Sequence, residues 1–167
     1  MPRPFEVTME SPATVDEVHA AFGDRVYWMD RLAHFGGAKS LEELTVDDDG
    51  TVRTVVAEDL RHGALPGILA KLYRGDLNIL STETWRPTAD GRVHGDIEVA
   101  VIGAPGSGSG RALLGPAKKG SQLDLAGSVE FRVPLVGGRI ESFVAGQFID
   151  GFADINRFTT EWIAGRA

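Results

Sequence analysis

The sequence predicts an α+β fold: a curved antiparallel sheet of about seven strands, two short helices after the first strand, and a long C-terminal helix packed on the sheet. Three observations predict this class. Segments that alternate apolar and polar residues are separated by Gly- and Pro-rich turns. Helical spacing of apolar residues occurs near the start and again at the end. The length of 167 residues suits a single domain spanning residues 1–167.

The first strand and both short helices are expected before residue 38. Residues 5–9 alternate apolar and polar side chains, which is typical of a half-buried strand. Thr14 and Glu17 have the spacing of a capping box, so a helix begins after Thr14. Asp24 is suited to cap a second helix, which the glycines at 36–37 end.

Turn residues divide the middle of the chain into strands. Asp-Asp-Asp-Gly at 47–50 predicts a hairpin between two apolar runs. Pro66 and its apolar neighbours predict a short helix within 61–75. Tight turns join the later strands, which predicts an antiparallel meander. These later strands are expected at 76–86, 92–102, 107–114 and 122–133, with a turn at 115–121.

A long amphipathic helix is predicted for residues 139–164. Ile140, Val144, Gly151 and Ile155 lie on one side of its helical projection. The sheet is the only large surface that could bury this side. We therefore expect the helix to lie across the sheet.

Composition excludes several functional classes. The net charge of −7 and pI near 5.0 disfavour nucleic acid as a partner. The absence of Cys removes thiol chemistry and Cys-based metal sites. No apolar run is long enough for a signal peptide or a membrane span, which predicts a cytoplasmic protein. The four histidines are scattered and expected in solvent, so no metal site is predicted. The Gly-rich run at 106–110 precedes a strand rather than a helix, and no cofactor is expected.

Several strings along the chain match known proteins, among them Val18-His-Ala-Ala-Phe22, Tyr27-Trp28, Arg31-Leu-Ala33, Tyr73-Arg-Gly-Asp-Leu77, Glu83-Thr-Trp85 and Val133-Pro-Leu-Val-Gly-Gly138. With these strings the chain resembles the START-like (SRPBCC) superfamily, and most closely an actinobacterial family of unknown function, DUF2505. The resemblance implies a helix-grip fold, in which the sheet grips the C-terminal helix around an internal cavity. The superfamily includes lipid-transfer domains and polyketide cyclases.

Independently of the resemblance, small residues at positions expected in the core favour a cavity. Gly151 stands where a close-packed core would place a large side chain. Sheet glycines such as Gly95 and Gly108 either leave volume or bend a sheet whose gaps are filled by aromatic rings. Strict alternation along its strand points Glu83 inward. A buried carboxylate there would bind a ligand hydroxyl or act as an acid or base, unless a bulge turns it outward or it has a structural partner such as an Arg or Tyr73. Gln147 would orient a ligand or satisfy a backbone carbonyl.

These observations predict a carrier or sensor of a small hydrophobic molecule, lipid-like or polyketide-like, that is not an enzyme. One alternative is an enzyme of the polyketide cyclase or dehydrase kind, for which Glu83 and Tyr73 are weak catalytic candidates. The other is a filled-core protein that associates with another protein. The segment 61–75 is expected at the mouth of the cavity. The candidate ligand-binding residues are Trp28, Leu32, Leu69, Leu72, Tyr73, Ile79, Glu83, Trp85, Ile97, Val99, Val144, Gln147, Phe148, Gly151 and Ile155.

Overall fold

The structure is a computed structural model that describes residues 2–59 and 77–166. The helix predicted within 61–75, and with it Leu69, Leu72 and Tyr73, lies outside the described residues.

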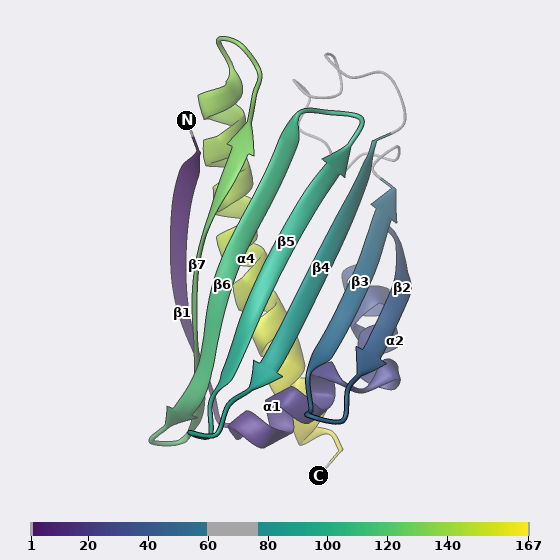
Figure 1. Cartoon of the computed structure of the whole chain (residues 1–167), viewed down its shortest axis with the longest axis vertical. Helices are drawn as coiled ribbons and strands as arrows, with labels where there is room; N and C mark the ends of the chain where they lie inside the picture. The colour runs from purple at the N-terminus through teal and green to yellow at the C-terminus, as the bar shows by residue number, and fades with distance from the viewer. Residues whose placement is uncertain (1, 60–76, 167) are drawn as a thin grey trace.

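The described chain is a seven-stranded antiparallel sheet with three helices on one side, as predicted. The strand order is β1-β7-β6-β5-β4-β3-β2, so every neighbouring pair except β1 and β7 is consecutive in the sequence. In Figure 1 the long helix α4 crosses behind the sheet, and α1 and α2 lie at its lower end. The strands are β1 (Arg3–Ser11), β2 (Ala38–Val46), β3 (Val52–Asp59), β4 (Asn78–Pro87), β5 (Val93–Ile102), β6 (Gly106–Ala117) and β7 (Gly120–Phe131); the helices are α1 (Val15–Phe22), α2 (Arg25–Phe35) and α4 (Gly137–Ala164).

Local signals set the helix starts where the sequence predicts them. The Thr14 side chain accepts a hydrogen bond from the Glu17 amide, and the Glu17 carboxylate accepts one from the Thr14 amide. The Asp24 side chain accepts from the Val26 amide, which begins α2. Gly36, at φ +68°, ends α2 in a conformation that suits glycine.

The turn predicted at 115–121 is wrong in extent. Residues 115–117 are paired with residues 120–122, so β6 and β7 continue to a tight turn at Lys118 and Lys119. Gly120, at φ +136°, supplies the backbone conformation that lets the hairpin close there. A cluster of Gly and Pro therefore indicated the turn but overstated its length.

The long helix α4 packs on the sheet near the edge formed by β1 and β7. It contacts β1 and β7, and its C-terminal half also contacts α1 and α2. Phe5 of β1 packs on Phe148 and Phe152 of α4, with ring centroids 5.9 and 6.4 Å apart. At the other end of the core, Tyr27 of α2 lies 5.3 Å from the ring of Trp162. This lateral position leaves space between α4 and the middle strands.

The glycines divide between the two interpretations that the sequence left open. An added Cβ at Gly95 would lie 2.5 Å from the Trp85 ring, and one at Gly106 would lie 2.4 Å from the Phe131 ring. Aromatic rings therefore fill the gaps at these sheet positions. A Cβ at Gly151, in contrast, would meet no atom within 4 Å. The missing side chain leaves volume on the helix.

Candidate functional site

A cavity of about 430 Å³ lies between α4 and strands β3, β4 and β5, with α2 closing one end. Four aromatic rings line it, from Trp28, Phe35, Phe148 and Phe152. The other lining residues are Arg31, Leu32, Lys39, Thr54, Val56, Glu58, Ser81, Glu83, Ile97, Val99, Gln147, Gly151, Asp154 and Ile155. Of these described lining residues ten are apolar and eight are polar or charged, so the wall combines apolar surface with several polar groups that could orient a small molecule.

The structure brings many of the predicted site residues together at this cavity. Those that line it are Trp28, Leu32, Glu83, Ile97, Val99, Gln147, Phe148, Gly151 and Ile155. Alternation along a strand and the 3.6-residue period of a helix predicted which side of each element faces inward, and those periods depend on local residues alone. Gln147 is exposed and therefore lies at the rim rather than deep inside.

Three predicted residues do not line this cavity. Trp85 packs against Phe22, with ring centroids 4.8 Å apart, and borders a separate internal void of about 30 Å³. Val144 packs with Phe131 and Ile140 near the start of α4. Ile79 is partly buried at the far end of β4. The lateral shift of α4 toward β1 and β7 places the cavity away from these side chains.

Glu83 is buried, at 9% exposure, and points inward as predicted. Its Oε2 lies 3.8 Å from Nη1 of Arg31 on α2, and both side chains are 11% exposed. Oε2 has no hydrogen-bond partner among the described residues. The guanidinium of Arg31 also stacks over the Trp28 ring, 4.4 Å from its centroid. Glu83 therefore has a charged partner, but its carboxylate retains hydrogen-bonding capacity.

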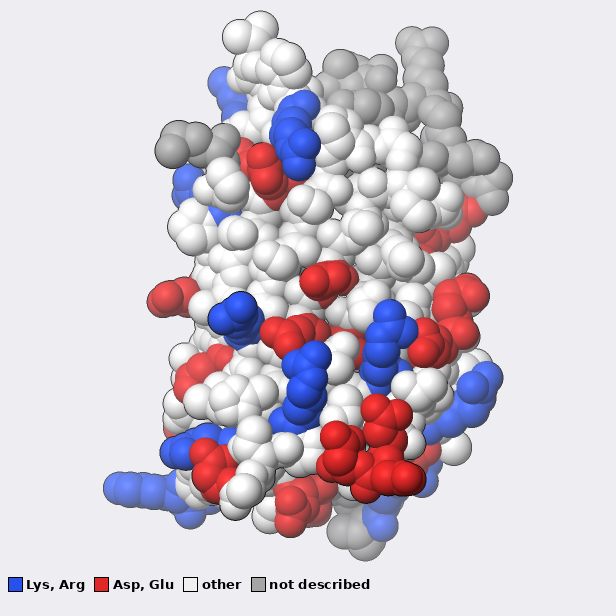
Figure 2. Space-filling view, viewed as in Figure 1, with Lys and Arg blue, Asp and Glu red and all other residues white. Residues whose placement is uncertain are grey.

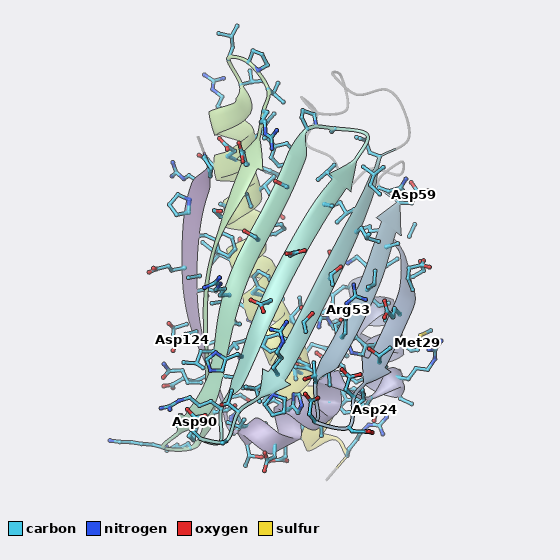
Figure 3. All side chains as sticks on the ribbon, viewed as in Figure 1. Asp24, Met29, Arg53, Asp59, Asp90 and Asp124 are labelled. Carbon is cyan, nitrogen blue, oxygen red and sulfur yellow. The ribbon has the colours of Figure 1, made fainter. Side chains whose placement is uncertain are left out.

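Thr54 of β3 lies directly across from Glu83 of β4 in the sheet register. It is 1% exposed, and its Oγ1 also finds no hydrogen-bond partner in the described part of the chain. Side chains alternate along a strand, so the neighbouring Arg53, labelled in Figure 3, points to the opposite, outer face. Thr54, Glu83 and Arg31 thus form one polar patch on the cavity wall.

Tyr27 and Arg31, two residues of α2 close to Glu83, have shifted pKa values. Burial raises the pKa of the Tyr27 phenol, more than the nearby Arg31 charge and the hydrogen bond to Thr159 lower it. Burial acts to lower the pKa of Arg31, but Tyr27 and Glu83 outweigh it and the pKa is raised. The Tyr27 hydroxyl lies 2.6 Å from Oγ1 of Thr159 on α4, and Arg31 Nη1 lies 3.5 Å from the same hydroxyl. Arg31 stays charged, and Tyr27 stays neutral at physiological pH.

Arg31 and Thr54 are site residues that the sequence analysis missed. Arg31 follows Trp28 by three positions, which places both on one side of α2. Thr54 alternates in phase with Val52 and Val56. These local periods could have found both residues. In the sequence, Val52, Val55 and Val56 indicated the hairpin, and Arg is a residue type that is seldom buried, so neither Thr54 nor Arg31 was predicted at the site.

The described residues contain neither a metal-binding cluster nor a membrane-spanning helix. No group of three or more His, Asp or Glu residues there could hold a metal ion. None of the described helices has the length and apolar character needed to cross a membrane.

The prediction that all histidines are solvated is wrong for His19, whose Nε2 lies 2.7 Å from the Gly50 carbonyl because the β2–β3 turn packs back on α1. On the face shown in Figure 2, acidic and basic side chains are interspersed.

The described elements form a helix-grip fold, in which an antiparallel sheet packs against a long C-terminal helix. Among solved structures, the chain is similar to TTHA0849 from Thermus thermophilus, with a TM-score of 0.61, 14% identity and 99% coverage of both chains. Norcoclaurine synthase from Thalictrum flavum, in complex with dopamine and hydroxybenzaldehyde, matches with a TM-score of 0.57 and 12% identity over 100% of this chain and 89% of that one. Ara h 8.0201 matches with a TM-score of 0.56 and 11% identity over 99% of both.

The family itself is identified by sequence. Residues 6–163 match the family model described as "Protein of unknown function (DUF2505)", and the chain belongs to this family. An uncharacterized protein of Mycobacterium tuberculosis, Rv0481c, is 35% identical over 170 residues, covering 98% of each chain. An uncharacterized protein of Mycobacterium bovis, Mb0491c, matches to the same extent.

Proposed function

We propose that this protein binds a small, mostly apolar molecule between α4 and the middle strands, and serves as a carrier or sensor. The observation that carries the proposal is the cavity of about 430 Å³, which combines four aromatic rings with a buried polar patch. Its volume lies within the usual range for ligand pockets, roughly 300–1,000 Å³. Burial of apolar ligand surface against such a wall would favour binding, and the polar groups would set the orientation of the ligand.

The contacts proposed for the ligand come from three sides. Trp28 and Leu32 contribute from α2, Ile97 and Val99 from β5, and five residues from α4: Gln147, Phe148, Gly151, Phe152 and Ile155. Leu69, Leu72 and Tyr73 are proposed at the mouth from the sequence alone. The norcoclaurine synthase complex supports the proposal, since a protein of similar fold holds two small aromatic molecules.

Gly151 allows a direct test. Glycine in a helix interior costs about 1 kcal/mol relative to alanine, yet no neighbouring atom requires it here. Gly151→Leu would place a side chain in the cavity without a backbone clash. Gly146, on the same helix, is exposed and also has no atom within 4 Å of an added Cβ, so Gly146→Leu is a matched control.

The measurement is binding of the neutral dye Nile red by fluorescence, with native mass spectrometry of the purified protein for co-purified molecules. We expect the wild type and Gly146→Leu to bind the dye alike, and Gly151→Leu to bind at least about tenfold more weakly. No binding by the wild type in either measurement, or equal binding by both variants, would contradict the proposal.

An enzyme of the polyketide cyclase kind is a second candidate, favoured by one observation. The buried Glu83 carboxylate has an oxygen without a hydrogen-bond partner among the described residues, as a general base toward a bound substrate requires. Turnover of an aromatic polyketide substrate that is lost in a folded Glu83→Gln variant would support it. The open cavity does not support the other alternative, a filled-core protein that associates with another protein.

A further inference from the structure

The polar patch of the cavity identifies the chemistry of the ligand's polar end. It consists of Thr54, Glu83 and Arg31, which come from β3, β4 and α2. Thr54 and Glu83 are cross-strand neighbours, so their side chains reach the cavity side by side. A buried hydrogen-bonding group without a partner costs about 1–3 kcal/mol, and Thr54 and Glu83, which both line the cavity, each carry one such buried oxygen. A ligand group that bonds both would recover this free energy.

The charge of the patch excludes some head groups. Arg31 and Glu83 neutralise each other across 3.8 Å. The other charged residues that line the cavity in the described part of the chain are Lys39, Glu58 and Asp154, so the described wall carries two cations and three carboxylates. A carboxylate or phosphate on the ligand would add a further negative charge next to Glu83 in a poorly hydrated site, where like charges repel strongly.

The hydrogen-bonding inventory narrows the choice further. Glu83 accepts hydrogen bonds and, when ionised, donates none. Thr54 both donates and accepts. A ligand hydroxyl fits both, because it donates to Glu83 and accepts from Thr54. An ether oxygen would meet Thr54 but leave Glu83 unpaired.

We propose that the cavity selects an apolar molecule whose polar end is an uncharged hydroxyl, bound between Glu83 and Thr54, over the corresponding carboxylate or ether. This inference rests on the proposed function, since it names the ligand class for the same cavity. The aromatic rings of Trp28, Phe35 and Phe152 make a flat apolar body a suitable probe.

The test uses three probes with one ring system: 2-naphthol, 2-methoxynaphthalene and 2-naphthoate. Displacement of Nile red at pH 7 gives the three affinities, and only the naphthoate is charged at that pH. We expect 2-naphthol to bind at least about tenfold more tightly than either of the others, which corresponds to one charge-assisted hydrogen bond.

Two variants then assign the preference to the patch. Glu83→Gln removes the negative charge beside Arg31, so it should weaken 2-naphthol and strengthen 2-naphthoate, each about tenfold. Thr54→Val keeps the side-chain shape but removes the hydroxyl donor, so it should weaken 2-naphthol and 2-methoxynaphthalene alike, each about fivefold. Thr82→Val, next to Glu83 on the opposite face of β4, is the matched control and should change nothing.

The outcomes separate this inference from the proposed function. If the wild type binds neither Nile red nor any probe, the proposed function itself is wrong. If the dye and probes bind but the three affinities are equal, or 2-naphthoate binds most tightly, the hydroxyl selectivity is wrong and the binding function stands. If Glu83→Gln does not fold, Thr54→Val still decides whether the polar end of the probe binds at the patch.

Discussion

Arg31 of α2 and Glu83 of β4 face each other across 3.8 Å, joining the helix that closes one end of the cavity to the middle of the sheet. Both side chains are nearly buried, and Arg31 is held in place by the Trp28 ring and the Tyr27 hydroxyl. The pair therefore belongs both to the stability of the fold and to the wall of the candidate site.

Arg31→Met should destabilise the protein by about 3 kcal/mol, because it leaves the Glu83 carboxylate buried without a counter-charge. The double variant Arg31→Met/Glu83→Leu should return to within about 1 kcal/mol of wild type, since an apolar pair of similar volume leaves no buried charge. Urea unfolding at pH 7 measures both. Arg157→Met removes an exposed ion pair with Asp154 and serves as the control, with a change below about 1 kcal/mol. Equal changes in unfolding free energy, below about 1 kcal/mol, for Arg31→Met and Arg157→Met would contradict this role.

Stability should fall steeply at high pH because of Tyr27. Its pKa is raised in the folded state, mainly by burial, so the unfolded chain loses the phenolic proton first. The stabilisation is fully present below the ordinary tyrosine pKa of 10.0 and is lost as the pH rises toward the folded-state value. Tyr27→Phe should lose about 1 kcal/mol at pH 7 with the Thr159 hydrogen bond, yet show a flatter decline above pH 10. Denaturant unfolding between pH 7 and 11 checks this; parallel pH profiles would rule it out.

Alanine at Gly95 and at Gly151 should have opposite effects. At Gly95 the added Cβ would overlap the buried Trp85 ring, so Gly95→Ala should destabilise by about 2 kcal/mol through overpacking. At Gly151 the methyl group meets open space and improves helix propensity, so Gly151→Ala should stabilise by about 0.5–1 kcal/mol. Thermal unfolding of the two variants gives the signs. A loss of stability in Gly151→Ala would mean that the helix is packed there.

Leu135→Gly should stabilise the protein despite removing an apolar side chain. Leu135 lies between β7 and α4, is fully exposed at 103%, and has φ +69°, the left-handed conformation that non-glycine residues avoid. The side chain buries no surface to lose, and relief of strain should contribute about 1 kcal/mol, partly offset by the greater entropy of glycine in the unfolded chain. Leu135→Ala keeps the strained backbone and should be near neutral. Urea midpoints of the two variants measure the difference, and a lower midpoint for Leu135→Gly would refute it.

The order of the elements and the caps at Thr14 and Asp24 were predictable from the sequence, and alternation along the strand favoured an inward Glu83. Each of these depends on a short stretch of chain, through hydrogen bonds within one turn of helix or the alternation of side chains along one strand. The glycine-rich turns were also located from local residues, although the extent of the turn at 115–121 was not, because strand pairing continues for as long as a partner strand lies alongside.

Which inward-facing residues meet at the cavity depends on contacts between distant parts of the chain. The register between β3 and β4 sets Thr54 against Glu83, and the seating of α2 brings Arg31 to the same point. The lateral position of α4 over β1 and β7 opens the space beside β3–β5, while Trp85 and Val144 pack elsewhere. These are contacts between residues far apart in the sequence, and no local period of side chains encodes them.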